Sequence, residues 1–296
     1  MPADALTGLA PAKINLFLHV GPPRGDGRHD LDSLVVFAGP EASDRLDVRR
    51  ADGRSMTVRG PMAETAGPDR DNLVMRAASA LAPQAGLHFE LEKHLPAAAG
   101  LGGGSADAGA ALRLVTRLLA LDPALARTVA PALGGDVLAC LHSVPLMMRG
   151  DGERVTRLGA PLPDLPALIV NPGLPCPTGP VFQRFDAVGG RFGLAETVRP
   201  DASDAAALTD WLAAETRNDL QGPAITLVPE IETCLAQLSA LPGVRLSRMT
   251  GSGASCFALF DGLETAQAAG KRLLETHPDW WMRATMLGEG ATACSM

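Results

Sequence analysis

A glycine-rich segment, residues 95–108, carries the clearest chemical signal in the chain, because four of the five residues from Gly100 to Gly104 are glycine and an alanine-rich stretch follows. Glycine adopts backbone conformations that are closed to other residues, so the N–H groups of such a loop can turn toward a ligand. A helix that begins near Ser105 would add unpaired N–H donors and the positive end of its dipole. The segment therefore predicts a site for a phosphate or another anion.

Two common glycine motifs do not fit this loop. A P-loop requires a lysine after its last glycine, but Ser105 follows Gly104 directly. A dinucleotide-binding loop requires a third glycine where Ser105 stands. It also requires a strand that ends in an acidic residue about twenty residues later, and the sequence predicts no such strand. A flexible surface loop remains the alternative interpretation, because glycine clusters are common at turns.

Three further motifs contain polar residues that could line a ligand site, although each also has an ordinary structural explanation. Lys13 and Asn15 share one face of an expected strand, although a strand lysine often faces solvent. Asp136 follows two glycines, which suits a carboxylate at a cavity wall or, equally, a helix cap. The turn 249–256 is small and rich in hydroxyls, so a ligand could approach its backbone, but an ordinary hairpin has the same composition.

Composition limits the classes of protein that can carry these motifs. With 296 residues, 46% hydrophobic and 20% charged, the chain is globular, with one large or two ordinary domains. The net charge of −7 argues against nucleic-acid binding. Five scattered cysteines without C-x-x-C spacing predict reduced thiols and no structural zinc. Without a signal peptide or a long apolar run, we expect a cytoplasmic protein that does not bind membranes.

The elements that must position the motifs follow from hydrophobic periodicity. In the first half we expect strands at 12–20, 33–37, 45–49, 55–58, 88–94 and 145–149, and helices at 71–81, 105–119 and 123–133. Prolines crowd the stretch 161–180, so we place a domain boundary near residue 160, between domains 1–160 and 161–296. In the second half we expect strands at 167–170, 245–249, 256–260 and 281–286, and helices at 204–215, 223–240 and 263–275. The fold class is therefore α+β.

The four motifs together resemble the GHMP kinase superfamily, which includes galactokinase, homoserine kinase, mevalonate kinase and phosphomevalonate kinase. Its three ordered motifs are similar to residues 11–16, 96–105 and 250–253. The resemblance implies an N-terminal domain like the second domain of ribosomal protein S5, a ferredoxin-like C-terminal domain and a cleft between them.

Within the superfamily, the chain is most similar to kinases that phosphorylate the 2-hydroxyl of 4-diphosphocytidyl-2-C-methyl-D-erythritol in the non-mevalonate isoprenoid pathway. The segments that carry this likeness also include 27–31, 71–73, 134–137 and 218–220. The likeness implies ATP and Mg²⁺ as cofactors, a small-molecule partner, and a monomer or weak homodimer. The alternatives are another GHMP small-molecule kinase, of the homoserine or mevalonate type, and a catalytically silent GHMP-fold sensor. The intact pair Lys13 and Asp136 argues against a silent protein.

The resemblance also implies roles for individual residues. Asp136 would take the proton from the acceptor hydroxyl, and Lys13 would neutralise charge that grows on the transferred phosphoryl group. Asn72 and Lys93 would lie near the adenosine of ATP, and Ser105 would help to hold Mg²⁺ or a phosphate oxygen. The residues expected around the ATP phosphates are Pro96, Gly100, Leu101, Gly102, Gly103, Gly104 and Ser105.

On the acceptor side the resemblance implies contacts from Asn15, His29, Thr178, Phe182 and Asp136. His29 would read the cytosine edge, and Phe182 would stack on the base. The family usually has a tyrosine at the position of Arg28. Because a guanidinium can also stack on a base, we hypothesise that Arg28 and Phe182 sandwich the cytosine.

Overall fold

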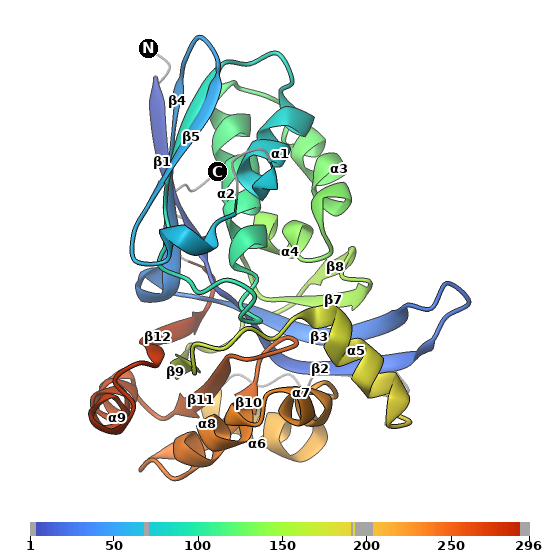
Figure 1. The fold of residues 1–296 in the computed structure, drawn as a ribbon, viewed down its shortest axis with the longest axis vertical. Helices are drawn as coiled ribbons and strands as arrows, with labels where there is room; N and C mark the ends of the chain where they lie inside the picture. Colours follow the sequence, from blue (N-terminus) through green and yellow to red (C-terminus); the bar gives the residue numbers. More distant parts are fainter. Residues whose placement is uncertain (1–3, 68–70, 191, 193–203, 291–296) are drawn as a thin grey trace.

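The computed structural model describes residues 4–67, 71–190, 192 and 204–290. They form an elongated molecule whose two parts each contain a β-sheet (Figure 1). The upper sheet has the strand order β1-β4-β6-β5. Its strands are β1 (Ala5–Pro11), β4 (Ser43–Arg50), β5 (Arg54–Arg59) and β6 (Leu87–Glu92). β5 pairs in parallel with β6, and the other pairs are antiparallel.

Four helices pack beside the upper sheet, with α2 against strands β1 and β4 (Figure 1). They are α1 (Leu73–Leu81), α2 (Gly103–Leu118), α3 (Pro123–Leu133) and α4 (Val137–His142). Small residues let α2 approach its neighbours closely: a Cβ on Gly109 would lie 2.7 Å from the backbone carbon of Cys140. The alanine-rich stretch after the glycine loop therefore belongs to the buried core of this part.

The lower sheet combines strands from both halves of the sequence, in the order β10-β11-β9-β12-β3-β7-β8, with β2 also paired to β3. Its strands are β2 (Lys13–Pro23), β3 (His29–Ala38), β7 (Leu146–Gly150), β8 (Arg154–Arg157), β9 (Leu165–Asn171), β10 (Val244–Met249), β11 (Cys256–Phe260) and β12 (Trp281–Gly288). β12 joins the two halves, since it pairs with β9 on one side and β3 on the other.

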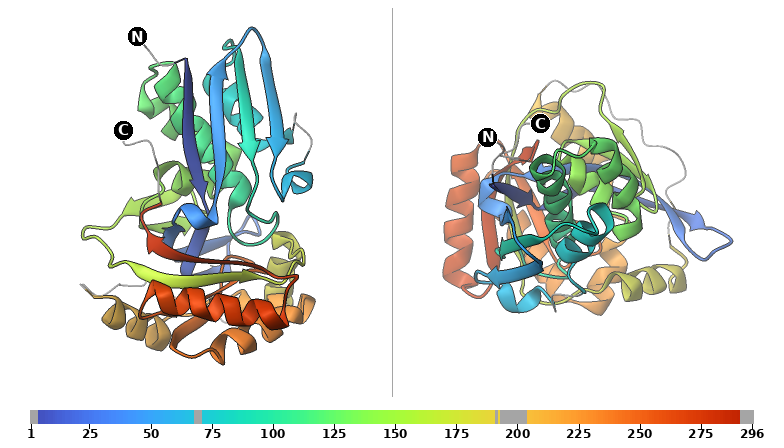
Figure 2. Two further views of the ribbon diagram at one scale, coloured as in Figure 1. Left: turned by 90° about the vertical axis from the view of Figure 1, so that its left-hand side faces the viewer. Right: turned by 90° about the horizontal axis from the view of Figure 1, so that it is seen from above.

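Five helices belong to the lower part: α5 (Thr178–Ala187), α6 (Ala205–Glu215), α7 (Gln221–Leu227), α8 (Glu230–Ser239) and α9 (Leu263–Thr276). α8 and α9 pack on the sheet, and Figure 2 shows α9, in red, below the strands. Two short 3₁₀ helices, Pro40–Ala42 and Ala63–Thr65, lie in connections. Among the described residues, no helix combines the length and apolar character needed to span a bilayer.

The α+β prediction is confirmed, but several individual elements differ from their predictions. The single helix expected at 223–240 is wrong, because α7 ends before Pro229 and α8 starts after it. Proline disfavours helical geometry in the residue before it, and Val228 has φ −134° and ψ 83°. α2 begins at Gly103, two residues before the expected start. The sequence patterns also missed β1, β8, α4 and α5. The domain boundary near residue 160 stays a prediction.

Four of the five cysteines lie in the described part of the chain. Cys140, Cys176, Cys234 and Cys256 are all buried and free, as expected for reduced thiols. Cys294 lies outside the described residues.

Candidate active site

A cavity of about 870 Å³ opens at the N-terminus of α2 and is lined by both parts of the molecule. All the site residues expected from the sequence line this cavity except Leu101. Leu101 is 1% exposed and belongs to the lower hydrophobic core, but its carbonyl accepts a hydrogen bond from Lys13 N at 2.8 Å. The motifs thus converge on one space, although they are far apart in the sequence.

Lys13 and Asp136 form an ion pair at this cavity. Lys13 Nζ donates to Asp136 Oδ1 at 2.8 Å; the lysine side chain is 4% exposed and the aspartate side chain 33% exposed. Lys13 therefore does not face solvent, although it lies on a strand. Asp136 precedes α4, but its side chain makes no capping hydrogen bond to that helix. Since Lys13 contacts only Oδ1 in the described structure, Oδ2 is left for another partner in the cavity.

The glycine loop brings the start of α2 to this ion pair. Gly102, with φ +64°, caps the helix, and the first helical hydrogen bond runs from Ala106 N to its carbonyl. The N–H groups between these two residues precede that bond and are free to bind a ligand. A Cβ on Gly102 would lie 3.3 Å from Lys13 Cβ and 3.7 Å from Asp136 Oδ2. An anion at the helix start would therefore lie beside the lysine and the carboxylate.

The turn between β10 and β11 supports the glycine loop from the other side. A Cβ on Gly100 would lie 2.4 Å from the carbonyl oxygen of Thr250, and Ser255 N donates to Ala99 O at 3.1 Å. Asn218 holds the turn by donating from Nδ2 to Met249 O and Gly251 O, both at 2.8 Å. The turn is a hairpin connection whose backbone also shapes the candidate phosphate site.

A buried charge cluster lies beneath the loop. Lys93 Nζ contacts Asp44, and it donates to Asp107 Oδ2 at 2.7 Å. Asp44 also accepts from the backbone N–H groups of His94 and Leu95, at 2.5 Å and 2.9 Å. A Cβ on Gly103 would lie 3.5 Å from Lys93 Nζ. The cluster thus fixes the start of the segment that leads into the loop.

Burial dominates the electrostatics of this cluster. Burial raises the pKa of Asp107 to about 7, because Lys93 offsets only part of the desolvation and Asp44 adds a second negative charge. Burial by itself would lower the pKa of Lys93, but Asp107 and Asp44 raise it overall. Sequence reasoning missed Asp44 and Asp107. The available signal for Asp107 was its position as a charged residue inside the alanine-rich helix α2.

Asn72 lines the cavity and also caps helix α1. Its Oδ1 accepts from Val74 N at 2.9 Å, which caps α1, and its Nδ2 donates to Ala66 O at 3.1 Å. Its expected position near adenosine stays a prediction.

Three residues expected on the acceptor side, His29, Phe182 and Arg28, also line the cavity. His29 is buried, with Nδ1 2.8 Å from Gly21 O and Nε2 3.0 Å from Asp186 Oδ1. The ring of Phe182 stacks on the His29 imidazole, at 5.8 Å between centroids and 26° between planes. Arg28 instead contacts Asp151 through Nη1 at 2.7 Å. Asp151 and Asp186 were missed by the sequence reasoning.

The hydroxyl of Thr178 and the amide of Asn15 also belong to the residues that line the cavity. Thr178 Oγ1 lies 2.9 Å from Ser252 Oγ, which links the start of α5 to the β10–β11 turn. Asn15 Nδ2 donates to Ser33 Oγ at 2.7 Å, whereas Asn15 Oδ1 is buried and has no hydrogen-bond partner in the described structure. A buried acceptor without a partner is costly, so a ligand donor would stabilise it.

Comparisons with known proteins agree with this arrangement. The family "GHMP kinases N terminal domain" matches residues 72–143, and "GHMP kinases C terminal" matches residues 195–279. A 4-diphosphocytidyl-2-C-methyl-D-erythritol kinase of Hyphomonas neptunium is 53% identical over 96% of this chain and 97% of its own. The kinase of the same name from Caulobacter vibrioides is 45% identical over 95% of this chain and 99% of its own.

Solved structures show the same relationship. A crystal structure of 4-(cytidine 5′-diphospho)-2C-methyl-D-erythritol kinase has a TM-score of 0.73 and 36% identity, covering 96% of this chain and 99% of the other. Homoserine kinase from Cytophaga hutchinsonii, with a TM-score of 0.63 and 18% identity over 99% and 98% of the two chains, shares the fold. The chain therefore belongs to the GHMP kinase superfamily and, within it, to the family of 4-diphosphocytidyl-2-C-methyl-D-erythritol kinases.

Proposed function

We propose that this protein is an ATP-dependent kinase that phosphorylates the 2-hydroxyl of 4-diphosphocytidyl-2-C-methyl-D-erythritol, giving the 2-phosphate and ADP, in the non-mevalonate isoprenoid pathway. One observation carries the proposal: the pair Lys13–Asp136, at 2.8 Å, lies against Gly102 at the start of α2, inside one cavity. The named relatives support the choice of acceptor, since two of them are 53% and 45% identical to this chain.

The geometry supports different roles for Lys13 and Asp136. Lys13 donates to Asp136 Oδ1, so Oδ2 is the oxygen that would accept the proton of the acceptor hydroxyl. The ammonium group also lies beside the helix start, where it would offset negative charge on the phosphoryl oxygens. Phosphoryl transfer depends mainly on positioning and electrostatic stabilisation, which suits a site built largely from backbone N–H groups.

The glycine loop fits the phosphates of ATP, because Cβ atoms at Gly100 and Gly102 would fill the space between the loop, the β10–β11 turn and the ion pair. Mg²⁺ prefers oxygen ligands and is commonly held by substrate phosphates with few protein groups. No cluster of three His, Cys, Asp or Glu residues in the described part of the chain suits a metal. The Ser105 hydroxyl, in the first turn of α2, is the group that would contact the ion. When bound, Mg²⁺ would neutralise phosphate charge.

Transfer of labelled γ-phosphate from ATP tests the proposal, with CDP, homoserine and mevalonate as comparison acceptors. We expect transfer to 4-diphosphocytidyl-2-C-methyl-D-erythritol alone. Asp136→Asn should lower kcat by at least about 100-fold while ATP affinity stays within a few-fold, because it removes the proton acceptor and keeps the shape. Undiminished turnover by this variant would refute the mechanism. Preferred transfer to homoserine or mevalonate would refute the acceptor.

The proposed reaction joins two small molecules and calls for neither nucleic acid nor membrane. We place it in the cytoplasm, and we expect a monomer or weak homodimer, which sedimentation velocity would test.

A further inference from the structure

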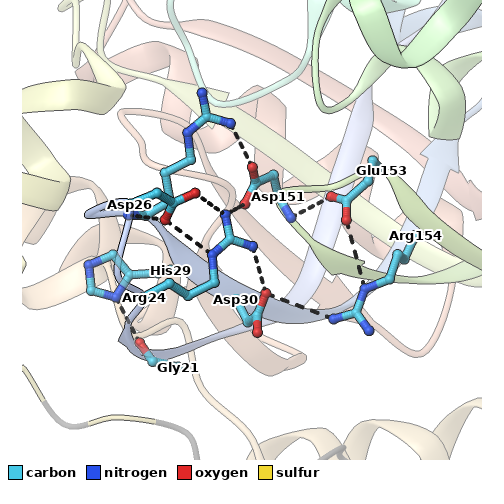
Figure 3. A network of polar contacts seen from close by, with 9 residues as sticks. Gly21, Arg24, Asp26, His29, Asp30, Asp151, Glu153 and Arg154 are labelled. Carbon is cyan, nitrogen blue, oxygen red and sulfur yellow. Dashed lines mark hydrogen bonds and ion pairs between the residues drawn. The ribbon is translucent and has the colours of Figure 1, made fainter.

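An ionic network joins the tip of the β2–β3 hairpin to the turn between β7 and β8, where Arg24 contacts Asp151 (Figure 3). Arg28 also pairs with Asp151, and both residues line the cavity. The tip is closed by hydrogen bonds from Arg24 N to Arg28 O and from Gly27 N to Arg24 O, at 2.7 Å and 2.9 Å. Asp26 Oδ1 accepts from the backbone N–H of Arg28 at 3.1 Å. The backbone that carries Arg28 is therefore fixed.

Asp151 anchors the guanidinium of Arg28 from the turn between β7 and β8. Its two carboxylate oxygens accept from Arg24 Nη2 at 2.6 Å and from Arg28 Nη1 at 2.7 Å. The same turn lies against the segment that precedes Asp136, since a Cβ on Gly135 would lie 2.4 Å from Asp151 O. Arg28 is thus tied to the wall that carries the candidate proton acceptor.

Arg28 differs from the other lysine and arginine side chains among the described residues that line the cavity. These are Lys13 and Lys93, which are 4% and 5% exposed and whose ammonium groups contact buried or half-buried carboxylates. The Arg28 side chain is 70% exposed. A guanidinium has five N–H donors, so its contact with Asp151 leaves donors for a second anion.

The aromatic surface of the cavity is made by other residues. Phe182 stacks on His29, and the guanidinium of Arg28 is held on Asp151. The base and the diphosphate of the acceptor would therefore meet different groups. From this separation we infer that Arg28 is a specificity-determining residue that binds the diphosphate of the acceptor, rather than a stacking partner of its base. The inference rests on the proposed function, which supplies a cytidine diphosphate group.

Binding of CDP and of cytidine, measured by titration calorimetry, separates the two roles. A residue that binds the diphosphate affects CDP alone, whereas a stacking residue affects both ligands. We expect Arg28→Ala to weaken CDP binding roughly tenfold or more, as for loss of a charge-assisted hydrogen bond, and to leave cytidine binding within twofold. Arg28→Lys should retain most of the preference for CDP over cytidine, whereas Arg28→Tyr should lose it.

Arg154→Ala is the matched control. Arg154 belongs to the same network, 3.8 Å from Asp30, and is 61% exposed, but it does not line the cavity. It should leave both affinities unchanged. Equal weakening of CDP and cytidine binding by Arg28→Ala, or rescue of the CDP preference by Arg28→Tyr, would overturn the inference while the proposed function stands. Failure of the unaltered protein to bind CDP would overturn both.

Discussion

Replacement of Gly100 by alanine tests whether contact between the glycine loop and the β10–β11 turn builds the proposed ATP site. Gly100 has φ +74°, and an added Cβ would lie 2.4 Å from Thr250 O and 2.9 Å from Gly253 O. The left-handed conformation costs an alanine about 1–2 kcal/mol, and forced rearrangement of packed groups costs about 1–3 kcal/mol. We therefore expect the free energy of unfolding to fall by about 2–5 kcal/mol.

The same substitution should also impair the reaction. Both close contacts are with backbone oxygens, which have no side-chain freedom, so the loop must move away from the turn. Such a movement displaces Gly102 relative to Lys13 and Asp136. We expect kcat/KM for ATP to fall at least about tenfold, which corresponds to about 1.4 kcal/mol of transition-state stabilisation.

Urea unfolding and steady-state ADP release measure the two effects. Gly222→Ala is the control, because Gly222 is exposed in α7 and a Cβ there would meet no atom within 4 Å apart from its chain neighbours and the backbone of its own helix. It should change the unfolding free energy by less than about 1 kcal/mol and leave kcat/KM unchanged. If Gly100→Ala keeps both quantities at the values of the unaltered protein, the loop does not depend on the turn and this reasoning is wrong.

Two further predictions concern the charged groups. Lys13→Met removes the donor at 2.8 Å from Asp136 Oδ1 and should lower kcat by at least about 100-fold. Lys271→Met, on the exposed face of α9, should leave kcat unchanged. Equal rates for the two variants in steady-state assays would contradict a catalytic role for Lys13. Asp107 has a folded pKa of about 7 against 3.8 for the free group, so it binds more protons in the folded state between these values and its contribution to stability is lost as pH rises through them. Urea unfolding of the unaltered protein and of Asp107→Asn measures this effect. The unfolding free energy of the unaltered protein should fall relative to that of the variant from about pH 4 to pH 7, and the difference should be constant above pH 7. A difference that stays constant over the whole range would exclude this titration.

Local sequence determined the parts of the site that depend on backbone conformation. The run from Gly100 to Gly104 and the alanines after it predicted a loop and a helix start, because glycine and alanine act on their own φ and ψ angles. One failure was also local: Pro229 interrupts a periodic apolar pattern, so two helices were predicted as one. Resemblance to a known superfamily supplied the roles that spacing could not.

Tertiary structure alone decided which side chains meet. Lys13 and Asp136 are 123 positions apart, and Arg28 and Asp151 are also 123 apart. Asp44, Lys93 and Asp107 come from a strand, a connection and a helix, and no spacing rule relates them. Contacts of this kind depend on how two sheets and their helices pack, because burial strengthens charge pairing that the unfolded chain lacks. The sequence predicted a phosphate site at the glycine loop; packing decided which charges surround that loop.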